Sequence, residues 1–273
     1  MCYNFCMKVS CIIPGYRDPW IHPTIESLLS NSELGDQMEI IVVLDGYWPV
    51  TPIKKDDRVR VVHLGKNRGM RGAINAGVKA AQGEYILRSD QHCTFGKGFD
   101  RILLEDCQPN WIMTATRYFL DPVKWEVMKD LEPVITEKLV IQGDRKFSGA
   151  KWRSRDRKYK DRDLIESMAM QGSCWFMPKA WWEKVIVKLD TKTFGQMYQD
   201  SHEMVFKTWK AGGRLIVSKK TWFAHKHRSF TQGRHEGTKE NSSLRGNNFE
   251  AGRRAIVIWG DYYQNIIRPK WKI

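Results

Sequence analysis

A carboxylate and an imidazole stand two residues apart in the segment Arg88-Ser89-Asp90-Gln91-His92-Cys93. The largely apolar run 83–87 before it is typical of a buried strand. Asp90 and His92 are therefore predicted to project on one side of the chain where that strand ends. One carboxylate oxygen and one imidazole nitrogen suit Mn²⁺ or a similar divalent ion that keeps positions open for substrate phosphates. The alternative is an aspartate that caps the next turn beside an incidental surface histidine.

Strands and helices alternate through the first half of the chain. Strands are predicted at 9–13, 39–44, 58–64 and 84–87, and helices at 23–30 and 68–81. Apolar strands separated by helices indicate an α/β fold, with a mostly parallel central sheet that helices cover on both faces. Ligand sites of such sheets lie beyond the carboxyl ends of the strands. The segments Pro14–Tyr16, Asp45–Gly46 and Asp90–His92 all fall there.

The second half of the chain is less regular. It is predicted to contain a charged and partly helical insertion at 121–165, an apolar segment at 170–176, helices at 179–187 and 200–211, and a strand at 215–217 that leads to His225. Residues 229–248 are polar and contain glycine, which predicts a mobile loop, and 249–267 fit a terminal helix with an apolar face. We therefore expect one domain over 1–230, with halves at 1–120 and 166–230 around the insertion. A helical extension over 231–273 would follow it.

The net charge of +14 is concentrated in one stretch. Residues 145–162 hold nine Lys or Arg against two Asp, which is half of the net charge. A polyanionic partner is the physical expectation, and a solubilising, solvated face is the alternative. Aromatic residues inside the run could stack on bases. The candidate nucleic-acid contacts are Lys151, Trp152, Arg153, Arg155, Arg157, Lys158 and Tyr159.

The six cysteines and the apolar runs bear on the compartment. The cysteines form no C-x-x-C pair, so they are interpreted as small buried side chains in a reducing compartment. No apolar run approaches the ~18–20 residues of a membrane span. The first eight residues lack the features of a signal peptide. These observations predict a cytoplasmic protein without a membrane span, and they leave the oligomeric state open.

Several segments occur in an order that is typical of one enzyme class. Segments 9–14 and 40–46 are two opening strands, and 67–77 fits the pattern N-x-G-x-x-x-A-x-N-x-G. Together they resemble GT-A-fold glycosyltransferases of family 2, which use nucleotide sugars. The second half looks more specifically like the polypeptide N-acetylgalactosaminyltransferases, whose D-x-H-C motif is similar to Asp90–Cys93. Three further motifs of that family are similar to the segments at 170–175, 200–215 and 223–228.

The resemblance implies a GT-A fold and metal-dependent transfer of a sugar from a UDP-sugar to an acceptor hydroxyl. Mn²⁺, or Mg²⁺, would be held by Asp90, His92 and His225. Asp200 is the candidate general base, as in inverting enzymes of family 2. In retaining relatives this position orients the substrates instead, and helix capping is the structural alternative. Glu203 is a second carboxylate on the acceptor side. The residues expected to bind the donor are Pro14, Tyr16, Asp18, Asp45, Arg68, Gly72, Ser89, Asp90, Gly172 and Arg228.

The acceptor follows from the charge run rather than from the resemblance. DNA that carries hydroxymethylated pyrimidines, as in phage-type DNA modification, is the expected acceptor. A protein serine or threonine, or a cell-surface glycan, is the alternative acceptor. A third hypothesis is a catalytically inactive GT-A protein that binds nucleic acid. The intact set Asp90, His92 and His225 argues against that third hypothesis.

Overall fold

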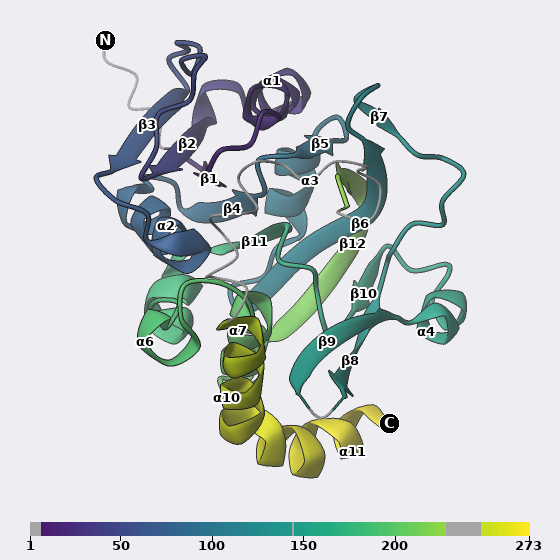
Figure 1. Cartoon of the computed structure of the whole chain (residues 1–273). Helices are drawn as coiled ribbons and strands as arrows, with labels where there is room; N and C mark the ends of the chain where they lie inside the picture. The colour runs from purple at the N-terminus through teal and green to yellow at the C-terminus, as the bar shows by residue number, and fades with distance from the viewer. Residues whose placement is uncertain (1–6, 144, 228–246) are drawn as a thin grey trace.

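The computed structural model describes residues 7–143, 145–227 and 247–273 (Figure 1). The first half builds a parallel sheet from β1 (Val9–Gly15), β2 (Met38–Asp45), β3 (Val59–Leu64) and β4 (Tyr85–Ser89), in the order β4-β1-β2-β3. α1 (Ile21–Asn31), the short η1 (Gly35–Gln37) and α2 (Gly69–Ala80) lie between these strands in the chain. The predicted α/β class and the parallel first half are confirmed.

The second half extends this sheet past β4. β11 (Cys174–Pro178) runs antiparallel between β4 and β6 (Trp111–Asp121), and β12 (Arg214–His225) runs parallel to β6. The edge strand β10 (Leu164–Glu166) and the short β5 (Cys93–Phe95) pair with β12, and β7 (Glu126–Val127) pairs with β6. The predicted strand at 215–217 is therefore only the start of β12, which continues through a bulge as far as His225.

Each face of the sheet has its own hydrophobic core, because alternate residues of one strand point to opposite faces. Ile12 and Val43 pack with residues of α2 and of α7 (Asp200–Lys210). Cys11 and Val42 pack on the other face, with residues of α1 and of α3 (Phe99–Asp106). The four cysteines in the described part of the chain are buried and free, as predicted. The predicted helix at 179–187 consists of α5 (Lys179–Trp181) and a π-helical turn, η2 (Trp182–Ile186), and α6 (Thr191–Phe194) follows it.

The charged insertion is partly helical, as predicted, but most of its regular structure is β-structure, which the sequence did not predict. β8 (Glu137–Gln142) and β9 (Lys146–Lys151) form an antiparallel pair, and α4 (Arg153–Lys158) is its one described α-helix. Leu139 and Phe147 of this pair are buried. These two residues give the strand pair an apolar side. The side is not apparent in the sequence, because most of the neighbouring residues are charged or polar.

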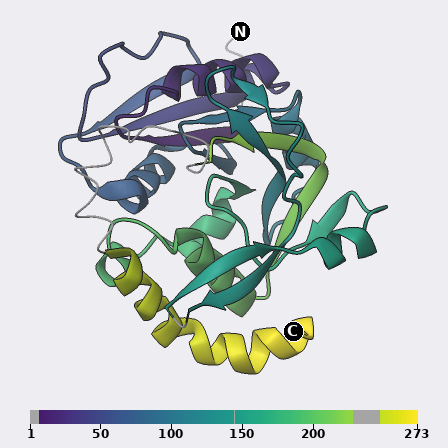
Figure 2. The ribbon, with the colours of Figure 1, turned by 45° about the vertical axis from the view of Figure 1, so that its right-hand side comes forward.

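The C-terminal segment supplies the surface that covers this side. α10 (Asn247–Tyr262), the π-helical η4 (Tyr263–Ile267) and α11 (Arg268–Trp271) run past β8 and β9 (Figures 1 and 2). The Tyr263 hydroxyl donates to the Leu139 carbonyl at 2.7 Å, and the Tyr263 ring lies 5.3 Å from that of Phe147. The predicted terminal helix thus shares the core of the domain. The predicted loop at 229–248 lies almost wholly outside the described residues. None of the described helices is long and apolar enough to cross a membrane.

Candidate active site

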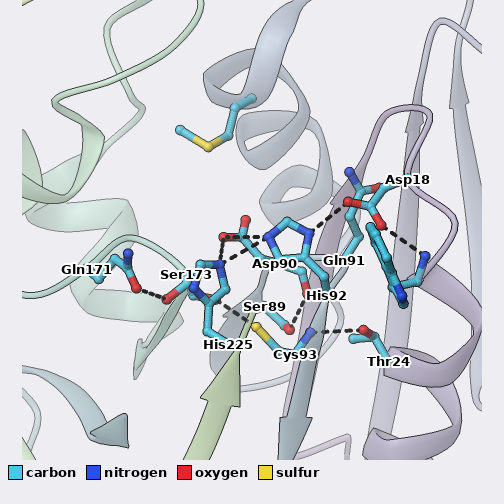
Figure 3. A network of polar contacts seen from close by, with 12 residues as sticks. Asp18, Thr24, Ser89, Asp90, Gln91, His92, Cys93, Gln171, Ser173 and His225 are labelled. Carbon is cyan, nitrogen blue, oxygen red and sulfur yellow. Dashed lines mark hydrogen bonds and ion pairs between the residues drawn. The ribbon is translucent and has the colours of Figure 1, made fainter. Parts of the chain in front are cut away.

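The three predicted metal ligands meet where two strands end. Asp90 and His92 follow β4, and β5 brings His225 to them because Cys93 stands opposite His225 in the pairing of β5 with β12. The possible ligand atoms of the three residues all lie within 4.8 Å of one another (Figure 3). The Nε2 atom of His225 is 3.1 Å from Asp90 Oδ2 and 3.1 Å from His92 Nε2.

The protonation states of these groups suit a divalent cation. Burial lowers the pKa of His225 to about 4 against the opposing effect of Asp90, so the imidazole is neutral at neutral pH. Burial alone would raise the pKa of Asp90. The Arg88 guanidinium, the hydrogen bond from His225 and the two nearby imidazoles outweigh burial and hold that pKa well below its usual range. One carboxylate and two imidazoles are a donor set that fits Mn²⁺ and related ions.

Asp18 holds one of these imidazoles in place. Its Oδ2 accepts a hydrogen bond from His92 Nδ1 at 2.8 Å, and its Oδ1 accepts the Trp20 backbone N–H at 2.9 Å. A proton on Nδ1 leaves the lone pair of Nε2 available to an ion, which is how carboxylates orient metal-bound histidines. The sequence reasoning assigned Asp18 to the donor site and missed this contact. No spacing rule links two residues that are 74 positions apart.

The first two strand ends carry the other residues expected near the donor. The Tyr16 backbone N–H donates to Gln91 Oε1 at 2.9 Å, and the Tyr16 ring lies edge-on to that of Tyr47 at 5.6 Å. Asp45 is buried, which raises its pKa, and its Oδ1 accepts the Arg68 backbone N–H at 2.7 Å. Pro14 pairs with Val43 inside the sheet. These contacts bring the end of β2 to the start of α2.

The start of α2 also fixes the segment that precedes Asp200. Gly69 has a φ of +73°, and a Cβ atom there would lie 2.3 Å from the Cβ of Gln196. Only glycine permits this approach without a shift of one segment. A Cβ on Gly72 would lie 2.6 Å from Arg68 Cβ, so Gly72 makes room for the Arg68 side chain. The two glycines thus serve packing around the predicted donor side.

Asp200 is the first residue of α7. The two residues before it have left-handed backbone conformations, with φ 69° at Tyr198 and φ 54° at Gln199. The Oδ2 atom of Asp200 is buried and finds no hydrogen-bond partner in the described part of the chain. A Cβ on Gly172 would lie 3.0 Å from this oxygen. The next residue, Ser173, accepts the Asp90 backbone N–H through its carbonyl oxygen at 2.8 Å. Asp200 therefore lies beside the segment that is bonded to Asp90.

Glu203 does not face an acceptor, and that expectation is corrected. Its side chain is 1% exposed and forms ion pairs with Arg71 and, at 2.7 Å, with Lys207. Arg71 also donates to the Tyr198 carbonyl oxygen through two nitrogens, at 2.8 and 3.0 Å. Glu203 lies one helical turn after Asp200, and its side chain points into the core, where Arg71 of α2 supplies the counter-charge. Glu203 supports the Asp200 segment from inside the protein.

Ser89 and Arg228 are the remaining residues predicted on the donor side. The Ser89 side chain is buried, and its hydroxyl donates to the Asp90 carbonyl oxygen at 2.7 Å, so it is engaged within the chain instead of facing a donor. Arg228 lies outside the described residues. Its neighbour Lys226 donates its backbone N–H to the His92 carbonyl oxygen at 3.1 Å, and its ammonium lies 4.2 Å from the centre of the Trp20 ring. The chain that leads to Arg228 thus passes beside the ligand set.

The predicted nucleic-acid contacts divide into three groups. The Arg155 guanidinium lies over the rings of Trp152, Tyr159 and Trp271 at 4.7–5.1 Å, and its Nε donates to the Glu166 carbonyl oxygen at 2.6 Å. These contacts give the half-buried Arg155 and Trp152 a packing role, and their assignment to a binding surface stays a prediction. Lys151 and Arg153 pair with Glu132. The exposed cations Arg157 and Lys158 remain, with half-buried Tyr159.

The sheet and the ligand set at its strand ends place the protein among α/β proteins of the GT-A type. Residues 10–186 match the model for glycosyl transferase family 2. Since that match covers well over half of the chain, the chain belongs to this family, as its sequence motifs predict.

Relatives and solved structures agree with the family. Polypeptide N-acetylgalactosaminyltransferase 4 of Mus musculus is 24% identical over 284 residues, which is 96% of this chain and 45% of the relative. The uncharacterized glycosyltransferase EpsJ of Bacillus subtilis (strain 168) is 32% identical over 166 residues, which is 53% of this chain and 46% of EpsJ. The chain thus spans less than half the length of these relatives.

The crystal structure of GalNAc-T7 with UDP, GalNAc and Mn²⁺ superposes with a TM-score of 0.69 at 15% identity, over 96% of this chain and 50% of that one. S. aureus TarS 1–349 in complex with UDP-GlcNAc gives a TM-score of 0.54 at 14% identity, over 85% of this chain and 61% of that one. At these identities the likeness shows the fold, and it confirms the predicted GT-A architecture.

Proposed function

We propose that the protein is a metal-dependent glycosyltransferase that moves a sugar from a UDP-sugar to an acceptor hydroxyl. The observation that carries this proposal is the meeting of Asp90, His92 and His225, whose ligand atoms lie within 4.8 Å at the carboxyl end of the sheet. Family membership and the fold support it. A divalent ion held there would neutralise the diphosphate leaving group and orient it.

Residues of the chain itself would position the metal ligands and accept the proton of the acceptor hydroxyl. Asp18 and Arg88 hold His92 and Asp90 in position, through contacts of 2.8 and 2.5 Å. The Asp200 carboxylate, whose buried Oδ2 has no partner in residues 7–143, 145–227 and 247–273, is the general base that takes the proton of the acceptor hydroxyl. The oxygen of that hydroxyl then attacks the anomeric carbon, and the bond to the diphosphate breaks. Burial of the groups around Asp200 keeps water from competing.

The donor is proposed to be a UDP-sugar because of where the strand ends lie and what similar proteins bind. Tyr16 and Asp45 stand at the ends of adjacent parallel strands, which is where open α/β sheets bind nucleotides. Two solved structures of the same fold are described with UDP and Mn²⁺ and with UDP-GlcNAc. Mg²⁺ is the alternative ion.

Hydrolysis and transfer assays test this proposal directly. The purified protein is incubated with UDP-glucose, UDP-GlcNAc or UDP-GalNAc, with Mn²⁺ or with EDTA, and UDP release is measured. Release that requires the ion and disappears in Asp90→Ala is expected. The matched control is Asp121→Ala, which removes a half-buried carboxylate of β6 whose oxygen accepts the backbone N–H groups of Val123 and Lys124. Full activity in EDTA or in Asp90→Ala would contradict the metal assignment.

For the acceptor we propose a polyanion, and DNA with hydroxymethylated pyrimidines is the first candidate. Arg153, Arg157 and Lys160 line an open hollow of about 570 Å³ beside α4, together with Glu132 and Asp156. Because two acids share this hollow, the surface is less basic than the charge run alone suggests. A polypeptide hydroxyl is the alternative, favoured by the match to a polypeptide N-acetylgalactosaminyltransferase along 96% of the chain.

A triple variant separates the two acceptors. Arg157→Ala, Lys158→Ala and Lys160→Ala together should lower the log–log salt slope of duplex binding by roughly 3, if all three contact phosphates. The control removes three exposed lysines elsewhere, Lys55, Lys79 and Lys184. UDP release without acceptor should be unchanged in both. Transfer to a peptide but not to hydroxymethylated DNA, with duplex binding equal in both variants, would select the polypeptide.

A further inference from the structure

Arg88 is a buried cation beside the candidate metal ligands. Its side chain is 1% exposed, and its Nη2 lies 2.5 Å from Asp90 Oδ1 and 3.4 Å from Met70 Sδ. The Nε and Nη1 atoms are buried and have no hydrogen-bond partner within the described ranges. The strand neighbours in register with Arg88 are the buried Ile12 and Trp175. In this apolar surrounding, Asp90 is the carboxylate that balances the guanidinium.

A metal ion would need the same carboxylate. Asp90 turns Oδ1 to Arg88 and Oδ2 to His225, so an ion between the ligands would share one negative charge with a buried guanidinium. Two cations on one carboxylate repel each other, and the burial of Arg88 limits how far water can screen that repulsion. Asp18 adds one negative charge through His92, and the positive charge of Arg117 is paired with Glu137 at 3.7 Å. The protein alone therefore provides little charge to hold a divalent ion.

We infer that Arg88 makes occupancy of the metal site depend on the nucleotide: the ion binds well only together with the diphosphate of the donor. This inference rests on the proposed function. The diphosphate supplies both the missing negative charge and oxygen ligands, so ion and nucleotide should strengthen each other's binding, and by the same factor. Arg88 is thus a positioning and charge-balancing residue that needs no contact with the substrate.

Mn²⁺ binding with and without UDP tests the inference, with free Mn²⁺ measured by electron paramagnetic resonance. Arg88→Gln removes the charge and keeps an N–H for Asp90 Oδ1. Arg88→Met removes both and places an unbranched apolar side chain beside Met70. Arg88→Lys keeps the charge. The matched control is Arg60→Met, which removes a guanidinium that pairs with Glu39 at 2.6 Å, near the opposite end of β2.

In the wild type, UDP should tighten Mn²⁺ binding about tenfold or more. Arg88→Gln should bind Mn²⁺ without UDP about tenfold more tightly than the wild type, so that the ion occupies the site without the nucleotide. Arg88→Met should change in the same direction if it folds, as circular dichroism would show. Arg88→Lys and Arg60→Met should stay near the wild type.

The binding data distinguish a failure of the inference about Arg88 from a failure of the proposed function. If Arg88→Gln binds Mn²⁺ without UDP no more tightly than the wild type does, the inference about Arg88 is wrong while the proposed function stands. If the wild type binds no Mn²⁺ even with saturating UDP, the proposed function itself fails.

Discussion

Removal of the Asp18 carboxylate should weaken metal binding without removing any metal ligand. Asp18 Oδ2 accepts from His92 Nδ1 at 2.8 Å, and the Asp18 side chain is 13% exposed. A hydrogen bond to a charged group contributes about 1.5–3 kcal/mol. That range corresponds to roughly 10- to 100-fold in affinity, which is also the typical effect of losing a carboxylate behind a metal-bound histidine. We therefore expect Asp18→Ala to weaken Mn²⁺ binding, measured with UDP present, by about 10- to 100-fold.

The tautomer of His92 provides a second readout that does not need the ion. In the wild type, ¹⁵N-resolved imidazole spectra should show the proton of His92 on Nδ1, and in Asp18→Ala a mixture with the Nε2 form. Asp18→Asn, whose carbonyl oxygen can still accept, should fall between the two. Asp36→Ala, at an exposed site in η1, is the control. Unchanged Mn²⁺ affinity together with an unchanged tautomer in Asp18→Ala would refute the reasoning.

Three other predictions concern the base, a half-buried histidine and the insertion. Asp200→Asn should lower turnover by about 10²–10⁴-fold while the dissociation constant for UDP, from calorimetry, stays within about threefold; loss of UDP binding would place Asp200 in the donor site. Burial lowers the pKa of His202 to about 4 from 6.5, so the folded protein keeps this side chain neutral. Stability should then fall as pH decreases from about 6.5 to about 4, by at most about 3 kcal/mol, and urea titrations of His202→Asn should lack that part of the loss. Arg155→Ala should lower the free energy of unfolding by about 1–3 kcal/mol, because it removes the guanidinium that lies over three aromatic rings. Arg157→Ala, at an exposed position, should change this free energy by less than about 0.5 kcal/mol.

The part of the fold that local pattern determines could be predicted from the sequence. β1 and β2 are buried along nearly their whole length, and such continuous apolar runs are recognisable without any knowledge of their partners. β8 and β9 were missed for the opposite reason. Their few inward residues, such as Leu139 and Phe147, are hidden among charges, and the surface they bury against comes from a helix more than 100 residues later.

The candidate site could likewise be predicted only in part from the sequence. The spacing of Asp90 and His92 indicates a shared side of the chain, which the structure shows. His225 could be added only through resemblance to a family, because the pairing of β5 with β12 joins residues about 130 positions apart. Polar contacts between residues that are far apart in the chain have no recognisable pattern in the sequence. The bond from His92 to Asp18 and the ion pair of Glu203 with Arg71 each join distant elements, so Asp18 was given a different role and Glu203 was wrongly placed on the acceptor side.

Anomalous diffraction from crystals grown with Mn²⁺ and UDP tests the central claim most directly. The account predicts one strong manganese peak about 2–2.3 Å from Asp90 Oδ2, His92 Nε2 and His225 Nε2, with the diphosphate oxygens completing its coordination. A manganese peak on other residues, or bound UDP with no manganese peak at these three side chains, would contradict it.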